Sequence, residues 1–597
     1  MVVYRGNVDA IYHHSSAARQ RQAESSFTTA PFLDVLGQFS ITSTPDWLAT
    51  GDFDADGHVD VIAAARSGQT LQLLSGDGQG HFPHARTVEV GGAITAFAVG
   101  EMDQADGLED VMLGVSSAAG AQVLIYAGPE GAVQSAPQAI EVGGPVTSLA
   151  LGQIDPHGAQ DLVIASGQEL LFVPGRWQHD DTAPTVSRRT FSSAITAVAV
   201  GNFDGKGNSE VAVLLSSGQV QVVGSKGAAA EQFANWAVRS GTKASSGANS
   251  QMLRAKVSSK PGDDLIVFGS ATAQLQVVMN GEATSATRAL TGKPVAVLPM
   301  RLNGDGLDDL VMLYEGQGAP IVALTDPVNI FVVTNTGDSG PGTLRQAISD
   351  ANASPGADAI YFDIGGGGII PRLDPLSSLP FITETVEIDG TTSPSVTIQL
   401  IGFSTGAGGN GLVLGGGANV VRGVLFFEWK DDGIEVASAN NVIEGNTCAT
   451  STGAAVHIAN VANNTVGGTV ALARNTIILN KVGVWIAGSG ATGNKVLGNR
   501  IGTDAMGTAD RGNLQDGVLI SGAKNNGIGG TTAGARNLIS GNDGWIWHPY
   551  SGQWSIRQPG TGQLHRHKCP GQSRPPQQYR WHLHRRRAQQ PHWRLCN

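Results

Sequence analysis

A short acidic turn between two apolar strands recurs about every 50 residues through the first half of the chain. The clearest copy, GDFDADGHVD, runs from Gly51 to Asp60, and an apolar Val-Ile-Ala follows it. The acids that close the copies stand at positions 60, 110, 161, 210, 264 and 309, so the spacing stays between 45 and 54 residues. A period of this length, with about four strands in each, is typical of a β-propeller blade. We therefore predict a β-propeller of six or seven blades over residues 30–327.

The acidic turn of the clearest copy has a chemical use. Asp52, Asp54 and Asp56 alternate along the chain, so their carboxylates converge where the loop curls, and Asp60 returns from the next strand. Hard oxygen ligands at alternating positions suit Ca²⁺, whereas carboxylates crowded without a cation repel one another. We predict a calcium site in this loop. The alternative is a solvated turn that is rich in aspartate.

The other copies are weaker candidates for the same ion. The second copy has one extra residue, and the sixth has Arg301 at the first ligand position. The third copy offers Asp155 and His157, and the fourth has Lys206 where a third ligand is expected. We predict that the fourth loop is metal-free, with the ammonium group in place of the cation. The weaker candidate ligands are Glu101, Asp103, Asp106 and Asp110 in the second copy, and Asn303, Asp305 and Asp309 in the sixth.

These loops resemble the FG-GAP repeats, also called VCBS repeats, of integrin α-chain propellers and many bacterial surface proteins. The resemblance covers about 300 residues and is most specific between residues 52 and 60. It implies a structural metal and a recognition role that requires no catalysis. The side-chain ligands that it implies are Asp52, Asp54, Asp56 and Asp60, with the backbone carbonyl of His58 as a further ligand.

The composition shifts toward Asn, Gly, Thr, Ile and Val over residues 328–544. The sequence NVIEGN at Asn441 has close copies that begin at Asn475, Asn494 and Asn537. Inward Ile and Val can stack along an axis, while Asn at the corners tolerates left-handed backbone and forms hydrogen-bonded ladders. This pattern is typical of a parallel β-helix, and we predict rungs of about 20 residues. A short capping helix is expected after Thr343, with an apolar stripe of Leu344, Ala347, Ile348 and Ala351.

Two segments carry a second resemblance. The lead-in VTNTGDSGPGTLRQAI at residues 333–348 and IGTDAMG at residues 501–507 are similar to segments of bacterial surface β-helices. The array thus resembles the right-handed parallel β-helix family, pectate-lyase-like in shape, some members of which cleave or epimerise acidic polysaccharides. An alternative function is therefore a polysaccharide lyase or hydrolase acting from the β-helix groove. The spacing places no acid–base pair, and Asp432 and Asp516 are expected as turn residues before Gly. The candidate acids and bases are Asp431, Asp432, Glu435, Asp504, Asp510, Asp516, Lys430 and Arg511.

Residues 545–597 differ from everything before them. They hold nine Lys and Arg and no acid, which leaves a charge of −21 on the rest of a chain whose net charge is −12. Such a tail is often a nucleic-acid arm, and its His and Cys residues match no zinc spacing. However, when residues 580–594 are back-translated and shifted by one nucleotide, they can read as a copy of residues 516–530. We interpret the tail as a frameshifted, non-native and disordered segment, and expect no nucleic-acid partner.

The remaining expectations concern class and location. Charged residues make up 15% and glycine 81 of the 597 residues, which argues against helical bundles and coiled coils. No run of 18 apolar residues exists, so no membrane insertion is expected. Residues 1–29 lack an apolar signal region and are predicted to be disordered. We expect an all-β, non-catalytic calcium-binding protein, secreted or at the cell surface, that recognises a carbohydrate or a protein. Millimolar calcium outside cells would fill weak sites.

Overall fold

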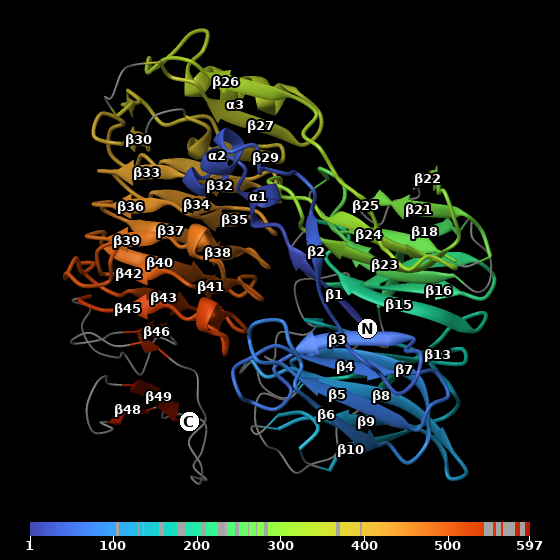
Figure 1. Cartoon of the computed structure of the whole chain (residues 1–597). Coiled ribbons are helices and arrows are strands. Elements are labelled where there is room, and N and C mark those ends of the chain that lie inside the picture. The colour runs from blue at the N-terminus through green and yellow to red at the C-terminus, as the bar shows by residue number, and fades with distance from the viewer. Residues whose placement is uncertain are drawn as a thin grey trace.

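In the described part of the chain, six antiparallel sheets follow one another between Trp47 and Ala323, each built from consecutive strands (Figure 1). These sheets are the six blades of a β-propeller, and they confirm the all-β prediction. The computed structural model describes residues 1–542 apart from 103–106, 129–130, 135, 155–159, 176–185, 206–208, 225–232, 234–235, 245–249, 261, 270, 280–284, 366–369 and 394–396. Beyond residue 542 it describes four strands, β46 (Gln553–Ile556), β47 (Gln563–Leu564), β48 (Arg580–His584) and β49 (His592–Cys596).

Among the described residues, each blade has four strands, except the last, which has three. Blade 1 contains β3 (Trp47–Gly51), β4 (Asp60–Ala64), β5 (Thr70–Ser75) and β6 (His84–Glu89). Blade 2 contains β7 (Ala93–Gly100), β8 (Asp110–Ser117), β9 (Gly120–Tyr126) and β10 (Gln138–Val142). Blade 3 contains β11 (Val146–Gly152), β12 (Asp161–Ser166), β13 (Glu169–Val173) and β14 (Ser187–Thr190). Blade 4 contains β15 (Ile195–Gly201), β16 (Glu210–Leu215), β17 (Gln219–Gly224) and β18 (Ala237–Lys243). Blade 5 contains β19 (Gln251–Ala255), β20 (Asp264–Phe268), β21 (Gln274–Val278) and β22 (Ser285–Ala289). Blade 6 contains β23 (Pro294–Met300), β24 (Asp309–Tyr314) and β25 (Ile321–Ala323).

The repeated acidic turn joins the first strand of every blade to the second. In blade 1 the register pairs Gly51 with Asp60 across the turn, and in blade 6 it pairs Met300 with Asp309. The second strands are buried along their whole length in blades 1, 3, 4 and 5, because both faces of each sheet pack against neighbouring blades. The outer strand β6 is almost entirely exposed. All six turns therefore lie at equivalent places in the propeller, at the ends of the first strands.

Three parallel sheets form the second domain, as predicted for a β-helix (Figure 1). Sheet 1 contains β26 (Ile330–Val333), β27 (Asp358–Phe362), β29 (Val386–Asp389), β32 (Val420–Arg422), β35 (Val442–Glu444), β38 (Thr465–Gly467), β41 (Lys495–Leu497) and β44 (Gly527–Ile528). Sheet 2 contains β28 (Arg372–Leu373), β30 (Ile398–Ile401), β33 (Val424–Phe427), β36 (Thr447–Ala449), β39 (Thr476–Ile478), β42 (Arg500–Ile501) and β45 (Leu538–Ile539). Sheet 3 contains β31 (Leu412–Leu414), β34 (Ile434–Val436), β37 (Ala454–Ala459), β40 (Val482–Ala487) and β43 (Val518–Ser521). Short 3₁₀ turns η3 (Gly390–Thr392), η4 (Ala471–Ala473) and η5 (Ala533–Ala535) lie between strands.

Asparagine ladders run along the corners of the β-helix. In one ladder, the amides of Asn419, Asn441, Asn464 and Asn494 each donate to the side-chain oxygen of the next asparagine, the last to Asn526, at 2.8–3.0 Å. The steps are 22, 23, 30 and 32 residues long. The predicted ladders are confirmed, but the predicted rung of about 20 residues is too short for the later rungs, because longer turns separate their strands.

The capping helix α3 (Leu344–Ala353) is where the sequence predicts it. The Thr343 side chain accepts a hydrogen bond from the Gln346 backbone N–H and so caps the helix. The four residues of the predicted apolar stripe are buried. They join the core of the β-helix, which is made of inward Val, Ile, Leu and Phe from all three sheets.

The N-terminal residues differ from the prediction of disorder. They form β1 (Val2–Gly6), α1 (Val8–Ile11) and α2 (Ser16–Ala23), and β1 pairs with β2 (Phe32–Gln38). Asn7 and Ser15 cap the two helices by accepting hydrogen bonds from backbone N–H groups. The segment is polar, and its order comes from contacts with distant parts of the chain. Tyr12 donates to Glu444 at 2.9 Å, and Arg19 donates to the Ser393 carbonyl at 2.8 Å.

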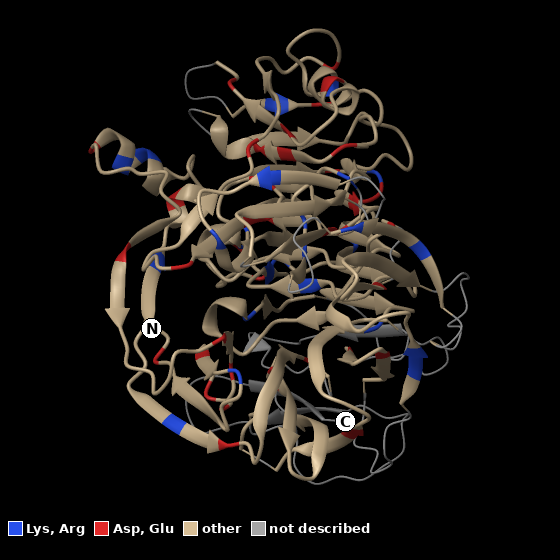
Figure 2. Ribbon diagram, turned by 90° about the vertical axis from the view of Figure 1, so that its right-hand side faces the viewer, with Lys and Arg blue, Asp and Glu red and all other residues tan. Residues whose placement is uncertain are grey.

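The propeller edge that carries several acidic turns faces sheet 1 of the β-helix. A Cβ atom on Gly306 would lie 1.7 Å from the Ala418 carbonyl oxygen, so the blade 6 turn meets the β-helix backbone directly. Arg422 of β32 is 2% exposed and donates to the Gly304 carbonyl at 2.6 Å. Figure 2 shows that charged residues are thinly scattered on the side it presents. The two domains therefore meet side by side, through close backbone contact and a few buried charges.

Candidate metal centre

Blade 1 brings three carboxylates together in the turn between β3 and β4. One oxygen from each of Asp52, Asp54 and Asp60 lies within 4.8 Å of the other two. Asp52 and Asp60 are buried and Asp54 is half-buried. Gly57 has a φ of +88°, which lets the chain turn sharply enough to return to Asp60. A group of this kind could hold a metal ion.

Two oxygens in the group fit a bound cation. Asp52 Oδ1 and Asp54 Oδ1 are buried and accept no hydrogen bond from the described residues. No described Lys or Arg forms an ion pair with Asp52, Asp54 or Asp60. A buried carboxylate oxygen without a partner is costly. The donor set is entirely oxygen, which suits a hard divalent cation.

The closing acid of each blade also has a structural role. In blade 1 the Asp60 carboxylate accepts hydrogen bonds from the Phe53 N–H at 2.9 Å and the Gly76 N–H at 2.9 Å. The corresponding N–H groups near the turn donate to the closing acids of the other blades at 2.7–2.9 Å, at Asp110, Asp161, Glu210, Asp264 and Asp309. This backbone staple explains why an acid recurs at that position even where the rest of the ligand set is missing.

Blades 4 and 5 place a side-chain cation where blade 1 has none. In blade 4, Arg239 pairs with Asp204 at 2.8 Å and lies 3.7 Å from Glu210. Lys206, the predicted substitute cation, lies outside the described residues. In blade 5, the Lys256 ammonium is buried inside the turn and donates to three backbone carbonyls, those of Ser258, Lys260 and Gly262. The acids of these two turns are thus neutralised by the chain itself.

Blade 6 closes its turn with hydrogen bonds. The Thr325 hydroxyl contacts Asp305 at 3.0 Å and Asp309 at 3.0 Å, and the Asn303 amide donates to Asp305 at 3.1 Å. Burial raises the pKa of Asp305 to about 6. The predicted residues of this turn, Asn303, Asp305 and Asp309, therefore lie together but bind one another and Thr325.

One predicted side-chain ligand of blade 1, Asp56, lies outside the carboxylate group, whereas the role of the His58 backbone carbonyl stays a prediction. Asp56 and His58 are exposed, and Asp56 Oδ1 accepts a hydrogen bond from the His58 N–H at 2.8 Å. Ala55 between the acids has a φ of +62°, which turns the chain before Asp56. Simple alternation along the loop predicts convergence of all three aspartates, but this left-handed residue interrupts it.

The second acidic turn is described only in part. The Gly107 N–H donates to Glu101 at 2.9 Å, as the Gly57 N–H donates to Asp52 at 3.1 Å in blade 1. Asp110 is buried. The other two predicted ligands of this turn, Asp103 and Asp106, and Asp155 and His157 of the third turn lie outside the described residues.

Sheet 3 of the β-helix carries an acid–base pair that the sequence analysis missed. Asp432 accepts a hydrogen bond from His457 Nδ1 at 2.8 Å and one from the Ala454 N–H at 2.6 Å. The His457 ring stacks on Trp485, with ring centroids 4.1 Å apart. The register aligns Glu435, His457 and Trp485 in one row on adjacent strands. The only signal in the sequence was that Glu435, His457 and Trp485 stand at outward-facing positions of strands in neighbouring rungs.

Other predicted features of the β-helix are structural. Trp429 and Cys448 are fully buried and belong to the core of the β-helix. The Glu435 carboxylate accepts a hydrogen bond from the Asn410 amide at 2.6 Å, and Asp504 accepts three hydrogen bonds within its own loop. The interpretation of residues 545–597 concerns a segment of which the structure describes only four short strands.

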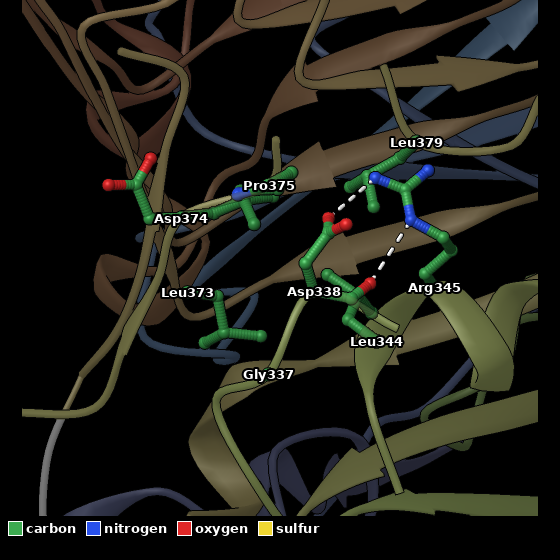
Figure 3. A pocket seen from close by; sticks show the side chains of 9 residues that line it. Gly337, Asp338, Leu344, Arg345, Leu373, Asp374, Pro375 and Leu379 are labelled. Carbon is green, nitrogen blue, oxygen red and sulfur yellow. Dashed lines mark hydrogen bonds and ion pairs between the residues drawn. The ribbon is translucent and has the colours of Figure 1, made fainter. Parts of the chain in front are cut away.

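A small hollow beside the capping helix is no ligand site. Asp338 and Arg345 form an ion pair of 2.8 Å across it, and Arg345 also donates to the Asp338 carbonyl at 3.1 Å (Figure 3). The cavity measures about 10 Å³, which is room for about one water molecule. Among the described residues, no helix has the length and apolar character needed to cross a bilayer.

Comparisons with known proteins add little to this geometry. No family model matches the chain. No curated protein matches it either. Two crystal structures of BBS1N in complex with ARL6DN, one soaked with mercury and one with lead, are 15% identical to it. They cover 47% and 48% of this chain and 78% and 81% of their own, with TM-scores of 0.34 and 0.35. At such scores the likeness supports no conclusion about function.

Proposed function

We propose that the chain is a calcium-binding recognition protein of FG-GAP/VCBS type, whose propeller holds a structural Ca²⁺ in blade 1. The observation that carries the proposal is the group of Asp52, Asp54 and Asp60, with two buried oxygens that lack a partner among the described residues. Comparison within the propeller supports it, because blades 4 and 5 fill the same place with Arg239 and Lys256. We prefer calcium to Mg²⁺ because a set of carboxylates from one turn suits the irregular all-oxygen coordination of calcium, whereas Mg²⁺ requires a near-ideal octahedron.

The proposal extends to location and partner. Weak calcium sites are filled at the millimolar concentration outside cells, so we place the protein in the extracellular space or at a cell surface. Both domains present broad repeated surfaces, which suit a carbohydrate or protein ligand. On this proposal the protein is non-catalytic. A second candidate, a polysaccharide lyase or hydrolase, is favoured by one observation, the Asp432–His457 pair on sheet 3.

Calcium titration by calorimetry tests the metal site. Asp54→Ala removes one of the converging carboxylates and should abolish the blade 1 binding event, together with the stabilisation by calcium. That stabilisation is about 2.7 kcal/mol at a calcium concentration one hundred times Kd. The matched control is Asp204→Ala, which alters the same position of blade 4, where Arg239 supplies the positive charge. If Asp54→Ala and the wild type titrate alike, the site assignment is wrong.

Calcium affinity should also depend on pH. Burial raises the pKa of Asp60 to about 6 from an ordinary value of 3.8. The metal-free fold therefore binds a proton at Asp60 more tightly than the unfolded chain does, and it loses stability as pH rises from about 4 through 6. Calcium needs the ionised carboxylate, so its binding should be about tenfold weaker at pH 5 than at pH 7.5. An affinity that stays constant over this range, measured by the same titration, would contradict the role of Asp60.

The recognition role is tested by binding to arrayed polysaccharides and surface proteins in calcium and in EDTA. Calcium-dependent retention without any change in the ligand supports the proposal. Release of new reducing ends or unsaturated sugars, lost in His457→Ala, would instead favour the second candidate.

A further inference from the structure

The seam between blades 6 and 1 differs from the other contacts between blades. One buried apolar cluster joins each of blades 1 to 5 to the blade that follows it. Among the described residues, no such cluster joins blade 6 to blade 1. Val297 and Met312 of blade 6 pack on blade 5, whereas Leu298 and Leu313, on the opposite face, are 54% and 37% exposed. Blade 6 therefore lacks a covering sheet on that face.

A side-chain hydrogen bond between blades is also missing at this seam. Elsewhere, the N–H that follows the first strand of a blade donates to the side chain that precedes the closing acid of the next blade. These bonds measure 2.8–3.1 Å and run from Asp52 to Glu109, Glu101 to Gln160, Asn202 to Asp263 and Lys256 to Asp308. Blade 1 has Val59 at the accepting position, and this 47% exposed side chain has no acceptor for the Arg301 N–H of blade 6. The contacts that join the other blades therefore do not close the ring here.

The N-terminal segment, which contains the ribbon of β1 and β2, touches both blades of this seam (Figure 1). A Cβ atom on Gly304 in the blade 6 turn would lie 3.4 Å from His13 Cε1. Phe39 packs edge-on against Phe82 of blade 1, with ring centroids 5.2 Å apart. Among the described residues, β1 and β2 pair only with each other, and neither strand has a buried residue. The ribbon is therefore half of a four-stranded sheet, and β2 has an unpaired edge.

An open groove follows β2. It is lined by residues 32–36 of this strand, which are apolar apart from Asp34, together with Arg5 and Thr28. Arg5 and Asp34 are exposed, and in the described part of the chain neither side chain forms an ion pair or a hydrogen bond. An exposed apolar edge strand is a template for pairing with another strand. A groove that carries one charge of each sign is complementary to a second copy of itself.

We propose that two copies of this chain pair through the free edges of their β2 strands and form a four-stranded antiparallel sheet, β1–β2–β2–β1. A two-fold axis between residues 34 and 35 sets Leu33 of each copy opposite Leu36 of the other, and it keeps the two Asp34 carboxylates from lying opposite each other. The same axis brings the Arg5 of each copy to the groove that holds the other copy's Asp34. A second copy is the occupant that fits, because it supplies both the missing strand number and the opposite charges. The paired ribbons then have as many strands as each of blades 1 to 5.

Sedimentation velocity of the full chain tests the proposal. The wild type should be a dimer at micromolar concentration. Arg5→Asp leaves two negative charges in the groove and Asp34→Arg leaves two positive ones, so each variant alone should dimerise about tenfold more weakly. An equimolar mixture of the two variants should form a heterodimer at least as tight as the wild-type dimer, because opposite charges then face each other. A folding defect in either variant would not produce this rescue.

The control is Arg288→Asp, which reverses a charge on the exposed outer strand of blade 5 and should leave the dimer unchanged. Hydrogen-exchange mass spectrometry locates the contact, since residues 32–38 should exchange more slowly at high than at low protein concentration. The proposal is overturned by a wild type that stays monomeric or by single variants that do not associate when mixed. A dimer in which residues 32–38 exchange equally at both concentrations also overturns it.

Discussion

Replacing Arg422 with methionine should destabilise the protein by about 3–5 kcal/mol and loosen the contact between the two domains. The guanidinium lies 3.6 Å from Glu387 and 3.3 Å from Glu444, and these side chains are 2% and 5% exposed. Arg422 also donates to the carbonyls of Ile11 and Gly304, so one side chain connects the N-terminal segment, the propeller and the β-helix. Methionine preserves much of the volume but leaves two buried carboxylates without this cation.

Scanning calorimetry measures the effect. The variant should melt at a lower temperature than the wild type. Its two domains should unfold in two separate transitions, whereas the docked domains of the wild type unfold together. Arg372→Met is the matched control, because the Arg372 side chain is 58% exposed and its 3.3 Å pair with Asp374 is worth about 0–1 kcal/mol. An Arg422→Met profile that overlays the control would show that the buried charges do not hold the domains together.

The second large effect is expected in the asparagine ladders, where Asn475→Ala should cost about 3 kcal/mol. Asn475 is fully buried. Its amide donates to the Ile443 carbonyl at 2.8 Å and to Asn499 Oδ1 at 2.9 Å, and its oxygen accepts from the Asn446 N–H at 2.9 Å. Alanine leaves several of these groups unpaired in a place that water cannot reach.

Native-state hydrogen exchange shows which part of the Asn475→Ala variant loses stability. Amides of the rungs on both sides of residue 475 should exchange faster in the variant, while those of the propeller should not. Asn352→Ala serves for comparison, since the Asn352 side chain makes two hydrogen bonds, to the Phe381 carbonyl and from the Thr383 N–H, but in contact with solvent. Equal exchange in the two variants would mean that the ladder contributes no more than a surface asparagine does.

Much of the fold follows from periodicity. The 45- to 54-residue spacing predicts the blades because each period holds one complete sheet, and the closing acids mark its second strand. The asparagine pattern predicts the ladders because only a stacked corner buries so many amides. The predicted length of the rungs was too short, because insertions in the turns lengthen a rung from 22 residues at Asn419 to 32 at Asn494 without disturbing the ladder.

The candidate site was predictable where it depends on local sequence. Asp52, Asp54 and Asp60 converge as expected, since they lie on one hairpin. The sequence alone could not show that Asp56 lies outside the carboxylate group. The positive φ of Ala55, which leaves Asp56 exposed, is a property of the folded turn. The Asp432–His457 pair joins consecutive rungs 25 residues apart, so it emerges only once the register is known.

The backbone staple has a consequence for how such an array can diverge. Since the closing acid holds its turn through N–H groups of the chain, a blade keeps its shape whether its charge is balanced by an ion, by Arg239 or by Lys256. If blade 1 holds the proposed ion, a single codon change that brings in a basic side chain would therefore free that blade from its need for a metal without altering its neighbours. In that case, evolution can remove or restore the metal requirement of one blade at a time.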